Sequence, residues 1–491
     1  MKVINCAETN NNPYTPRVEK PWDARRVMHL FRRTSFGANQ DTVADALDKN
    51  PIDVVFSLVG KAVTLPLTPA PIWANWTLND YSSNPDVRNT QISNQIIEWS
   101  SQWVTDMKKN GLRDRMSWFW GNHFVTKIDT YYCPSWMYRY HQLLQKHALG
   151  NFKTLVKEMG LTPAMLIFLN NIQNTRLQIN ENYARELLEL FTLGVDNGYT
   201  QQDITNIARA ITGWNGIDQT NLCGEVTFVP LLWDPGNKTI FGKTGPWNYD
   251  DVIDLLFNER PIQISEFICR KLYQNFVNPE VDEETVKGLA TIFRNGNFEL
   301  APVMRAMLST EHFFDDTCIG TIIPGHIEYF LTFLNELGYR DEAELLYAVG
   351  LSAGEFNQQI LNPTDVAGWP GNRNWVNTGS FSYRSEGIMN IMGYYYTKNG
   401  NQVEELRTFA KKLNNSLESD PEIVARKIID YLLPNGLQNE SDYTNALVAF
   451  KAEIPENYFE SGQWNLDWEY APVQVFYLMT HLAYLPEYQL K

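Results

Sequence analysis

Four polar residues in the segment ENYARELLELFTLG have the types and the spacing that a chemical site needs. Asn182, Arg185, Glu186 and Glu189 recur at the three- and four-residue intervals that place side chains on one face of a helix. The positions between them are apolar, so the polar stripe is narrow where a surface helix has a broad polar face. This pattern indicates a stripe that is buried or lines a cleft, and buried charge must be paired, hydrogen-bonded or metal-bound.

A histidine in the segment RDRMSWFWGNHF supplies a second candidate. On a helix, His123 shares a face with Met116, Phe119 and Trp120. Such aromatic surroundings favour the neutral imidazole that metal ions and general-base chemistry require. The neighbouring Asn122 is a candidate binding residue. A core histidine with one backbone partner is the alternative interpretation.

The two segments together predict a metal-assisted or acid/base hydrolase if their helices pack against each other. His123, Glu186 and Glu189 would then offer one nitrogen and two carboxylates to a divalent metal ion. The pattern lacks the second histidine of H-E-x-x-H, and Arg185 supplies a counter-charge to Glu189 four residues on. A buried ion network that fixes helix packing is therefore the favoured interpretation of the stripe. If the stripe lines a cleft instead, Asn182 and Arg185 are candidate binding residues.

Tryptophans and planar polar side chains gather in a loop over residues 361–380. Trp369, Arg373 and Trp375 lie there among several asparagines, in the segment LNPTDVAGWPGNRNWVNTGS. Aromatic faces beside amides and a guanidinium suit stacking on a ring and bonding its hydroxyls, which predicts recognition of a glycan or peptide. A self-packed loop whose polar side chains satisfy its own backbone is the alternative.

Residues 236–244 nearly match a phosphate-binding loop and follow a strand-like run. The two glycines are one residue too far apart, and Gly245-Pro246 obstructs the helix that must begin at the Lys-Thr pair. The sequence therefore argues against nucleotide hydrolysis, while Lys238 stays a candidate anion-binding residue.

Charge and composition exclude several classes of protein. The net charge of −16 over 491 residues argues against a nucleic-acid partner, and no apolar run is long enough for a membrane span. The five cysteines are scattered without a C-x-x-C pair, which predicts reduced, mostly buried thiols rather than a disulfide framework. The N-terminal segment lacks the apolar core of a signal peptide, so we expect a cytoplasmic protein, or an exported one if the N-terminus is trimmed.

Hydrophobic periodicity predicts a mainly α fold. We expect a polar arm over residues 1–20 and one large helical domain over 21–491, with two lobes (21–220 and 248–491) as the alternative. A strand-like run at 224–233 and the Gly- and Pro-rich loop after it predict a small β and loop excursion across 221–247. The helix that carries the polar stripe is expected at about 180–193.

Several ordered segments resemble the uncharacterised bacterial "domain of unknown function 1800" family. The matching pieces run from HLFRRTSFG (29–37) through RDRMSWFWGNHFVT (113–126), NYARELLELFTLGVDNGYTQQDI (182–204), ARAITGW (208–214), DPGNKTIFG (234–242) and FICRKLYQNFV (267–277) to PEYQL (486–490). The resemblance implies a predominantly helical fold and brings no established activity. It also implies a partner from the "domain of unknown function 1501" family, whose members look like sulfatase or phosphatase relatives. Many members have histidine where this chain has Trp233.

Three hypotheses follow from these patterns. The first is a soluble binding or accessory protein that acts with a hydrolase-like partner, with its ligand cleft near residues 182–189 and the 369–375 loop. The second is a hydrolase that uses His123, Glu186 and Glu189. The third is a structural ion network with no active site.

Overall fold

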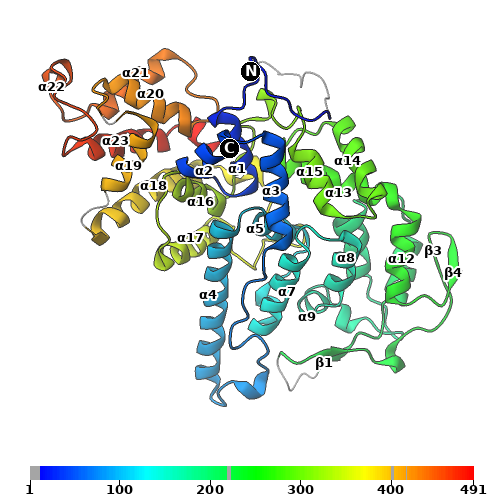
Figure 1. Ribbon diagram of the computed structural model, residues 1–491. Coiled ribbons are helices and arrows are strands. Elements are labelled where there is room, and N and C mark those ends of the chain that lie inside the picture. Colours follow the sequence, from blue (N-terminus) through cyan, green and yellow to red (C-terminus); the bar gives the residue numbers. More distant parts are fainter. Residues whose placement is uncertain (1–10, 218–222, 400–402, 416) are drawn as a thin grey trace.

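The computed structural model describes residues 11–217, 223–399, 403–415 and 417–491. Helices dominate these residues, and the strands form two short hairpins (Figure 1). The predicted mainly α fold is therefore confirmed.

The helices divide into three runs along the chain. The first run comprises α1 (Ala24–Thr34), α2 (Gln40–Leu47), α3 (Pro51–Thr64), α4 (Pro85–Asn110), α5 (Leu112–His123), α6 (Ile128–Tyr131), α7 (Pro134–Lys146), α8 (Phe152–Gly160), α9 (Pro163–Phe168), α10 (Asn182–Glu186) and α11 (Gln201–Ala210). The second comprises α12 (Tyr249–Glu259), α13 (Pro261–Phe276), α14 (Glu283–Asn295), α15 (Leu300–Leu308), α16 (His326–Glu336) and α17 (Ala343–Glu355). The third comprises α18 (Thr378–Asn399), α19 (Val403–Leu413), α20 (Pro421–Leu432), α21 (Glu440–Phe450), α22 (Glu456–Glu460) and α23 (Ala471–Ala483).

Local sequence signals set the ends of the helices around the centre of the molecule. The side chain of Asn84 accepts hydrogen bonds at the start of α4, and Pro85 takes the first helical position, where a backbone N–H is not needed. Gly111 ends α4 with a φ of +59° and directly precedes α5, so a residue without a Cβ makes the sharp turn between them. This turn packs the apolar face of α5 against α4, and α5 also contacts α3 and α7.

The β excursion is smaller than the sequence pattern predicts. Within the strand-like run at 224–233, only Val226–Thr227 is a strand (β2), paired antiparallel with β1 (Gly216–Ile217). Pro230 lacks a backbone N–H and begins a 3₁₀ turn instead of continuing the strand. The second hairpin pairs β3 (Lys238–Ile240) with β4 (Lys243–Gly245) and lies at the opposite edge of the molecule from α19–α23 (Figure 1).

Helices from the two predicted lobes pack against each other. α12 contacts α8, α15 contacts α3, and α17 contacts the long helix α4. These contacts fit the single-domain alternative, and independent folding of the two halves stays a prediction. The described part of the predicted N-terminal arm also packs on the body, because Tyr14 is buried and its backbone N–H donates to the carbonyl of Ser309 at 2.8 Å.

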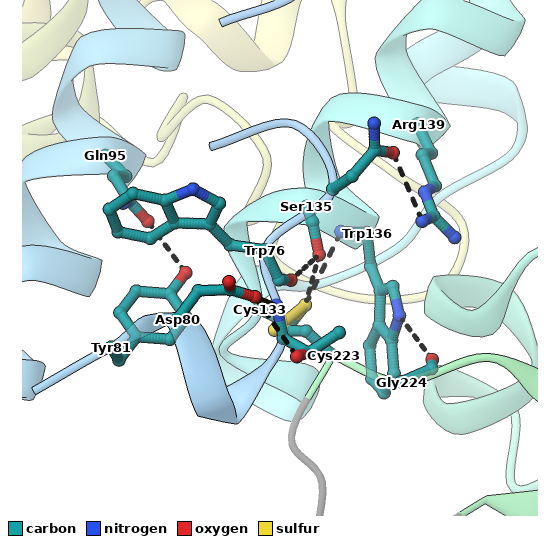
Figure 2. The surroundings of a disulfide bond; sticks show 12 residues. Trp76, Asp80, Tyr81, Gln95, Cys133, Ser135, Trp136, Arg139, Cys223 and Gly224 are labelled. Carbon is teal, nitrogen blue, oxygen red and sulfur yellow. Dashed lines mark hydrogen bonds between the residues drawn. A yellow bond between two sulfur atoms is a disulfide. The ribbon is translucent and has the colours of Figure 1, made fainter. Parts of the chain in front are cut away.

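A disulfide joins Cys133 to Cys223, which lie 90 residues apart (Figure 2). The bond fastens the segment that leads into β2 to the start of α7. Beside it, the indole N–H of Trp136 donates to the carbonyl of Gly224 at 3.0 Å. The prediction that the thiols stay reduced is wrong for this pair because folding brings the two distant cysteines together. Cys269 and Cys318 are buried and take no part in this disulfide, and Cys6 lies outside the described residues.

No helix among the described residues is long and apolar enough to cross a membrane. The expected compartment, cytoplasmic or exported if the N-terminus is trimmed, stays a prediction.

Replacing both Cys133 and Cys223 by alanine should lower the free energy of unfolding by about 2–5 kcal/mol, because the bond closes a long loop in the unfolded chain. Thermal melting with and without a reductant measures the effect. The reductant should lower the melting temperature of the wild type and leave the double variant unchanged. Equal melting of the wild type and the double variant under oxidising conditions would contradict the stabilising role of the bond.

Candidate functional site

A cleft of about 450 Å³ lies between α5, α13, the start of α16 and the loop at 367–375. This volume falls within the range of about 300–1,000 Å³ that is common for small-molecule sites. Side chains from α5 and α13 form two of its walls. The loop at 367–375, called the tryptophan loop below, forms a third. The cleft thus joins segments that are far apart in the sequence.

One face of α5 supplies the first wall. Arg115, Trp118, Phe119 and Asn122 line the cleft at helical spacing, followed by His123. The second wall repeats this pattern on α13, where Lys271, Gln274 and Asn275 share a face. Both sets follow the three- and four-residue spacing of a helix. The sequence pattern therefore predicts each helix face separately.

The tryptophan loop is fixed to α5 by a reciprocal pair of hydrogen bonds. The backbone N–H of Trp369 donates to Oδ1 of Asn122 at 2.6 Å, and Nδ2 of Asn122 donates to the Trp369 carbonyl at 3.4 Å. The indole of Trp369 also stacks on Trp118, with ring centroids 4.7 Å apart. Gly368 permits this approach, because it has a φ of +89° and a Cβ there would lie 2.3 Å from Oδ1 of Asn122.

His123 connects the cleft to the helix that carries the polar stripe. Its Nε2–H donates to the carbonyl of Phe191 at 3.0 Å, so Nδ1 accepts from Nζ of Lys271 at 3.3 Å. Phe191 lies in a π-helical turn, Leu187–Thr192, that continues α10 where the sequence predicts an ordinary helix. Burial and the Lys271 charge hold the pKa of His123 well below its usual value, which keeps the imidazole neutral as predicted.

Lys271 lines the cleft and forms no ion pair with any described carboxylate. Its ammonium lies 4.9 Å from the ring centroid of Phe267, in addition to its contact with His123. Burial lowers the pKa of Lys271 to about 8 because the charged form is poorly solvated there.

Glu328 is the only carboxylate side chain among the described residues that line the cleft, and it pairs with both Arg115 and Lys491. Burial disfavours its ionised form, but these two cations outweigh that effect and lower the pKa of Glu328 to about 2. Burial, together with the neighbouring Arg115, lowers the pKa of Lys491 to about 7. The cleft therefore contains more cationic side chains than one carboxylate can neutralise.

Unpartnered polar atoms in the wall are all hydrogen-bond donors. Among the described residues that line the cleft, Nε of Arg115, Nδ2 of Asn275 and Nε1 of Trp369 are buried and make no hydrogen bond. Outside the lining, the buried guanidinium groups of Arg33 and Arg384 also have unpartnered Nε and Nη1 atoms. Unpartnered buried donors cost free energy, so this wall favours an occupant that accepts hydrogen bonds.

The predicted polar stripe lies at the surface and does not line this cleft. Asn182 is exposed, and Glu186 is half-buried. Arg185 pairs with Glu189 at 3.3 Å, as its spacing predicts, and with Glu181 at 3.2 Å. The Arg185 side chain is 37% exposed, so the network is a surface one and contributes at most about 1 kcal/mol.

A sequence profile of one protein family matches residues 29–490, nearly the whole chain. The chain belongs to the family described as Protein of unknown function (DUF1800). No curated protein and no solved structure matches it. The resemblance seen in its sequence segments is therefore confirmed, and the DUF1800 family itself carries no assigned activity.

The structure of this DUF1800 protein does not bring the predicted catalytic set together. Both ring nitrogens of His123 are engaged by Phe191 and Lys271, and neither contacts Glu186 or Glu189. Within the described ranges, no group of three or more His, Cys, Asp or Glu side chains is arranged to hold a metal ion. The proposed metal set fails because the stripe faces outward and only the Phe191 backbone reaches the histidine.

Two other predicted binding residues lie outside the cleft. Lys238 is the buried first residue of β3, and its ammonium donates to the carbonyls of Asp234 at 2.5 Å and Trp247 at 3.1 Å, so it is not free to bind an anion. Arg373 is exposed and does not line the cleft, although Trp369 and Trp375 do. Trp233 packs against Lys238 and does not line the cleft.

Of the predicted residues, Asn122, His123, Trp369 and Trp375 come together in the cleft. Trp369 and Trp375 are buried, so they form its wall rather than an exposed platform. The sequence reasoning missed Lys271, Glu328 and Lys491. Spacing alone indicates the Lys271 face, whereas nothing local indicates that Glu328 and Lys491 meet across 163 residues.

The substitution Gly368→Ala should release the tryptophan loop from α5, because the new Cβ collides with Asn122 at a positive φ. We expect faster amide hydrogen exchange across residues 365–376 and a lower melting temperature. Gly371→Ala is the matched control, since Gly371 also has a positive φ of +70° but nothing lies within 4 Å of the added Cβ. Equal effects of the two substitutions would show that the contact with Asn122 does not hold the loop.

Proposed function

We propose that this protein is a binding protein that takes a small anionic ligand in the cleft between α5, α13 and the tryptophan loop. The observation that carries the proposal is that every unpartnered buried polar atom of the described cleft wall is a donor. Carboxylate, sulfate and phosphate groups offer several acceptor oxygens and suit such a wall.

The charge balance of the cleft supports the same ligand class. Arg115, Lys271 and Lys491 line it against the single carboxylate side chain of Glu328, in a chain whose net charge is −16. Burying an uncompensated cation is unfavourable, and a ligand anion would supply the missing counter-charge. The local positive charge also favours entry of an anion over a cation.

The remaining wall residues suit a ligand with a ring or planar groups. Trp118, Trp369 and Trp375 line the cleft as largely buried rings, and Asn122 and Gln274 line it with them. Aromatic faces next to amides fit the glycan or peptide recognition predicted from the loop. Acidic sugars and acidic peptide fragments are therefore the ligand classes to test first.

An accessory role beside a hydrolase-like partner of the "domain of unknown function 1501" family stays a prediction. A binding protein that holds an anionic fragment would suit such a partner, because sulfatase and phosphatase relatives act on anionic esters. No contact of the described residues favours the alternative hydrolase built on His123, Glu186 and Glu189.

Isothermal titration calorimetry tests the binding proposal with sulfate, phosphate and glucuronate, and with glucose as the uncharged relative of glucuronate. We expect one-to-one binding of at least one anion and none of glucose. Lys271→Gln should weaken that binding about 10- to 100-fold, the effect of losing one charged hydrogen bond.

The matched control is Lys243→Gln, which removes an exposed lysine outside the cleft. It should leave anion affinity unchanged. The proposal fails if none of the anions binds, or if the two lysine variants lose affinity equally.

Anion affinity should decline as the pH rises above neutrality. In the free protein the pKa of Lys491 is about 7 and that of Lys271 about 8, and a bound anion raises both because it favours the charged forms. Binding is therefore strongest below pH 7, takes up protons, and weakens as the pH rises through the two values. Calorimetry in two buffers of different ionisation enthalpy measures the proton uptake. Lys271→Arg should flatten the upper part of the profile, and a pH-independent affinity would contradict the role of the lysines.

A further inference from the structure

Lys271 differs from the other cations that line the cleft. Arg115 and Lys491 share Glu328, whereas Lys271 has no carboxylate partner among the described residues. Its one hydrogen-bond partner is Nδ1 of His123, a neutral acceptor. An amine that is placed in a ligand cleft without a counter-ion is poorly explained by a structural role alone.

Burial makes the uncharged amine of Lys271 more abundant than that of an exposed lysine. Burial removes solvent from the ammonium and lowers its pKa to about 8, whereas the Phe267 ring 4.9 Å away attracts the charged form. The imidazole of His123 can accept an N–H from either protonation state of Lys271. After loss of one proton to solvent, the contact with His123 therefore persists and the nitrogen lone pair is free to react with a ligand.

We propose that Lys271 captures the carbonyl group of an anionic ligand as an imine, so that the ligand class is a small oxo acid. This inference rests on the proposed function, because the cleft donors would hold the acid group. The neutral amine of Lys271 attacks the carbonyl carbon and forms a C–N bond while the carbonyl π bond breaks; one proton leaves the nitrogen and one joins the oxygen, which becomes a hydroxyl. The nitrogen lone pair then forms the C=N bond as the C–O bond breaks; the hydroxyl leaves as water with a proton from solvent, and the nitrogen gives its second proton to solvent.

The residue proposed to bind the acid group, Asn275, lies one helical turn from Lys271. Asn275 follows Lys271 by four residues on α13, so their side chains emerge about 6 Å apart on the same face. Nδ2 of Asn275 is one of the unpartnered donors of the wall. A 2-oxo acid carries its carboxylate next to its carbonyl, so a single small ligand presents both groups to this face of α13, which bears the amine and the unpartnered amide donor.

Reduction with borohydride tests the imine directly in the full-length protein. Glyoxylate, pyruvate and 2-oxoglutarate serve as probes, and peptide mass spectrometry locates the reduced adduct. At pH 8 a lysine with a pKa near 8 has a neutral fraction on the order of 100-fold larger than an ordinary lysine. We therefore expect labelling of Lys271 to saturate with at least one probe and to exceed that of the exposed Lys243 by about 10-fold or more at low probe concentration.

Propionate, a carboxylate without the carbonyl, separates this proposal from the binding proposal. If the acid group binds as proposed, propionate suppresses the labelling of Lys271 and leaves Lys243 unaffected. Lys271→Arg should abolish the adduct while retaining calorimetric binding of propionate. The imine proposal alone is overturned if propionate binds but Lys271 is labelled no faster than Lys243 by any of the three probes. Absence of both binding and labelling overturns the two proposals together.

Discussion

The cleft depends on one buried carboxylate that is shared by two cations. Glu328 on α16 pairs with Arg115 on α5 and with Lys491, and no second described carboxylate side chain lines the cleft. A buried ion pair offsets its desolvation only when its geometry is complete, and removing one partner leaves a strongly unfavourable charge. Glu328 therefore stabilises the approach of α5 and α16, yet it cannot neutralise Lys271 as well. That excess of positive charge distinguishes the cleft from the rest of an acidic protein.

Packing around this ion pair gives the cleft its shape. The Asn122–Trp369 hydrogen bonds hold the tryptophan loop over α5, and Gly368 allows the two backbones to approach closely. His123 joins the same helix to the carbonyl of Phe191 in a π-helical turn. The polar stripe that begins on α10 is thus connected to the cleft through the backbone, while its own side chains form a surface network. The charged side chains of the stripe and the Phe191 carbonyl that contacts His123 therefore face different surroundings, although they are neighbours in the sequence.

The sequence predicts what is local and misses what depends on distant contacts. Helical periodicity gives the mainly α fold, and the four-residue spacing gives the Arg185–Glu189 pair. Periodicity does not tell which side of a helix meets solvent, so the stripe is exposed where burial was expected. The Lys271–His123 contact spans 148 residues and the Cys133–Cys223 bond spans 90, so no local pattern indicates either partner. Lys238 is a further case. Its position after a strand-like run predicts an anion-binding residue, whereas in the structure its ammonium donates hydrogen bonds to two backbone carbonyls.

Anomalous diffraction from crystals of the full-length protein soaked in bromide would test most directly whether the cleft is an anion site. Bromide is a single-atom anion that needs no knowledge of the natural ligand, and its scattering identifies it without ambiguity. The account predicts an anomalous peak within the cleft, in contact with Lys271 and with the donors of Arg115 or Asn275. Bromide peaks confined to the outer surface, with none in the cleft, would contradict it.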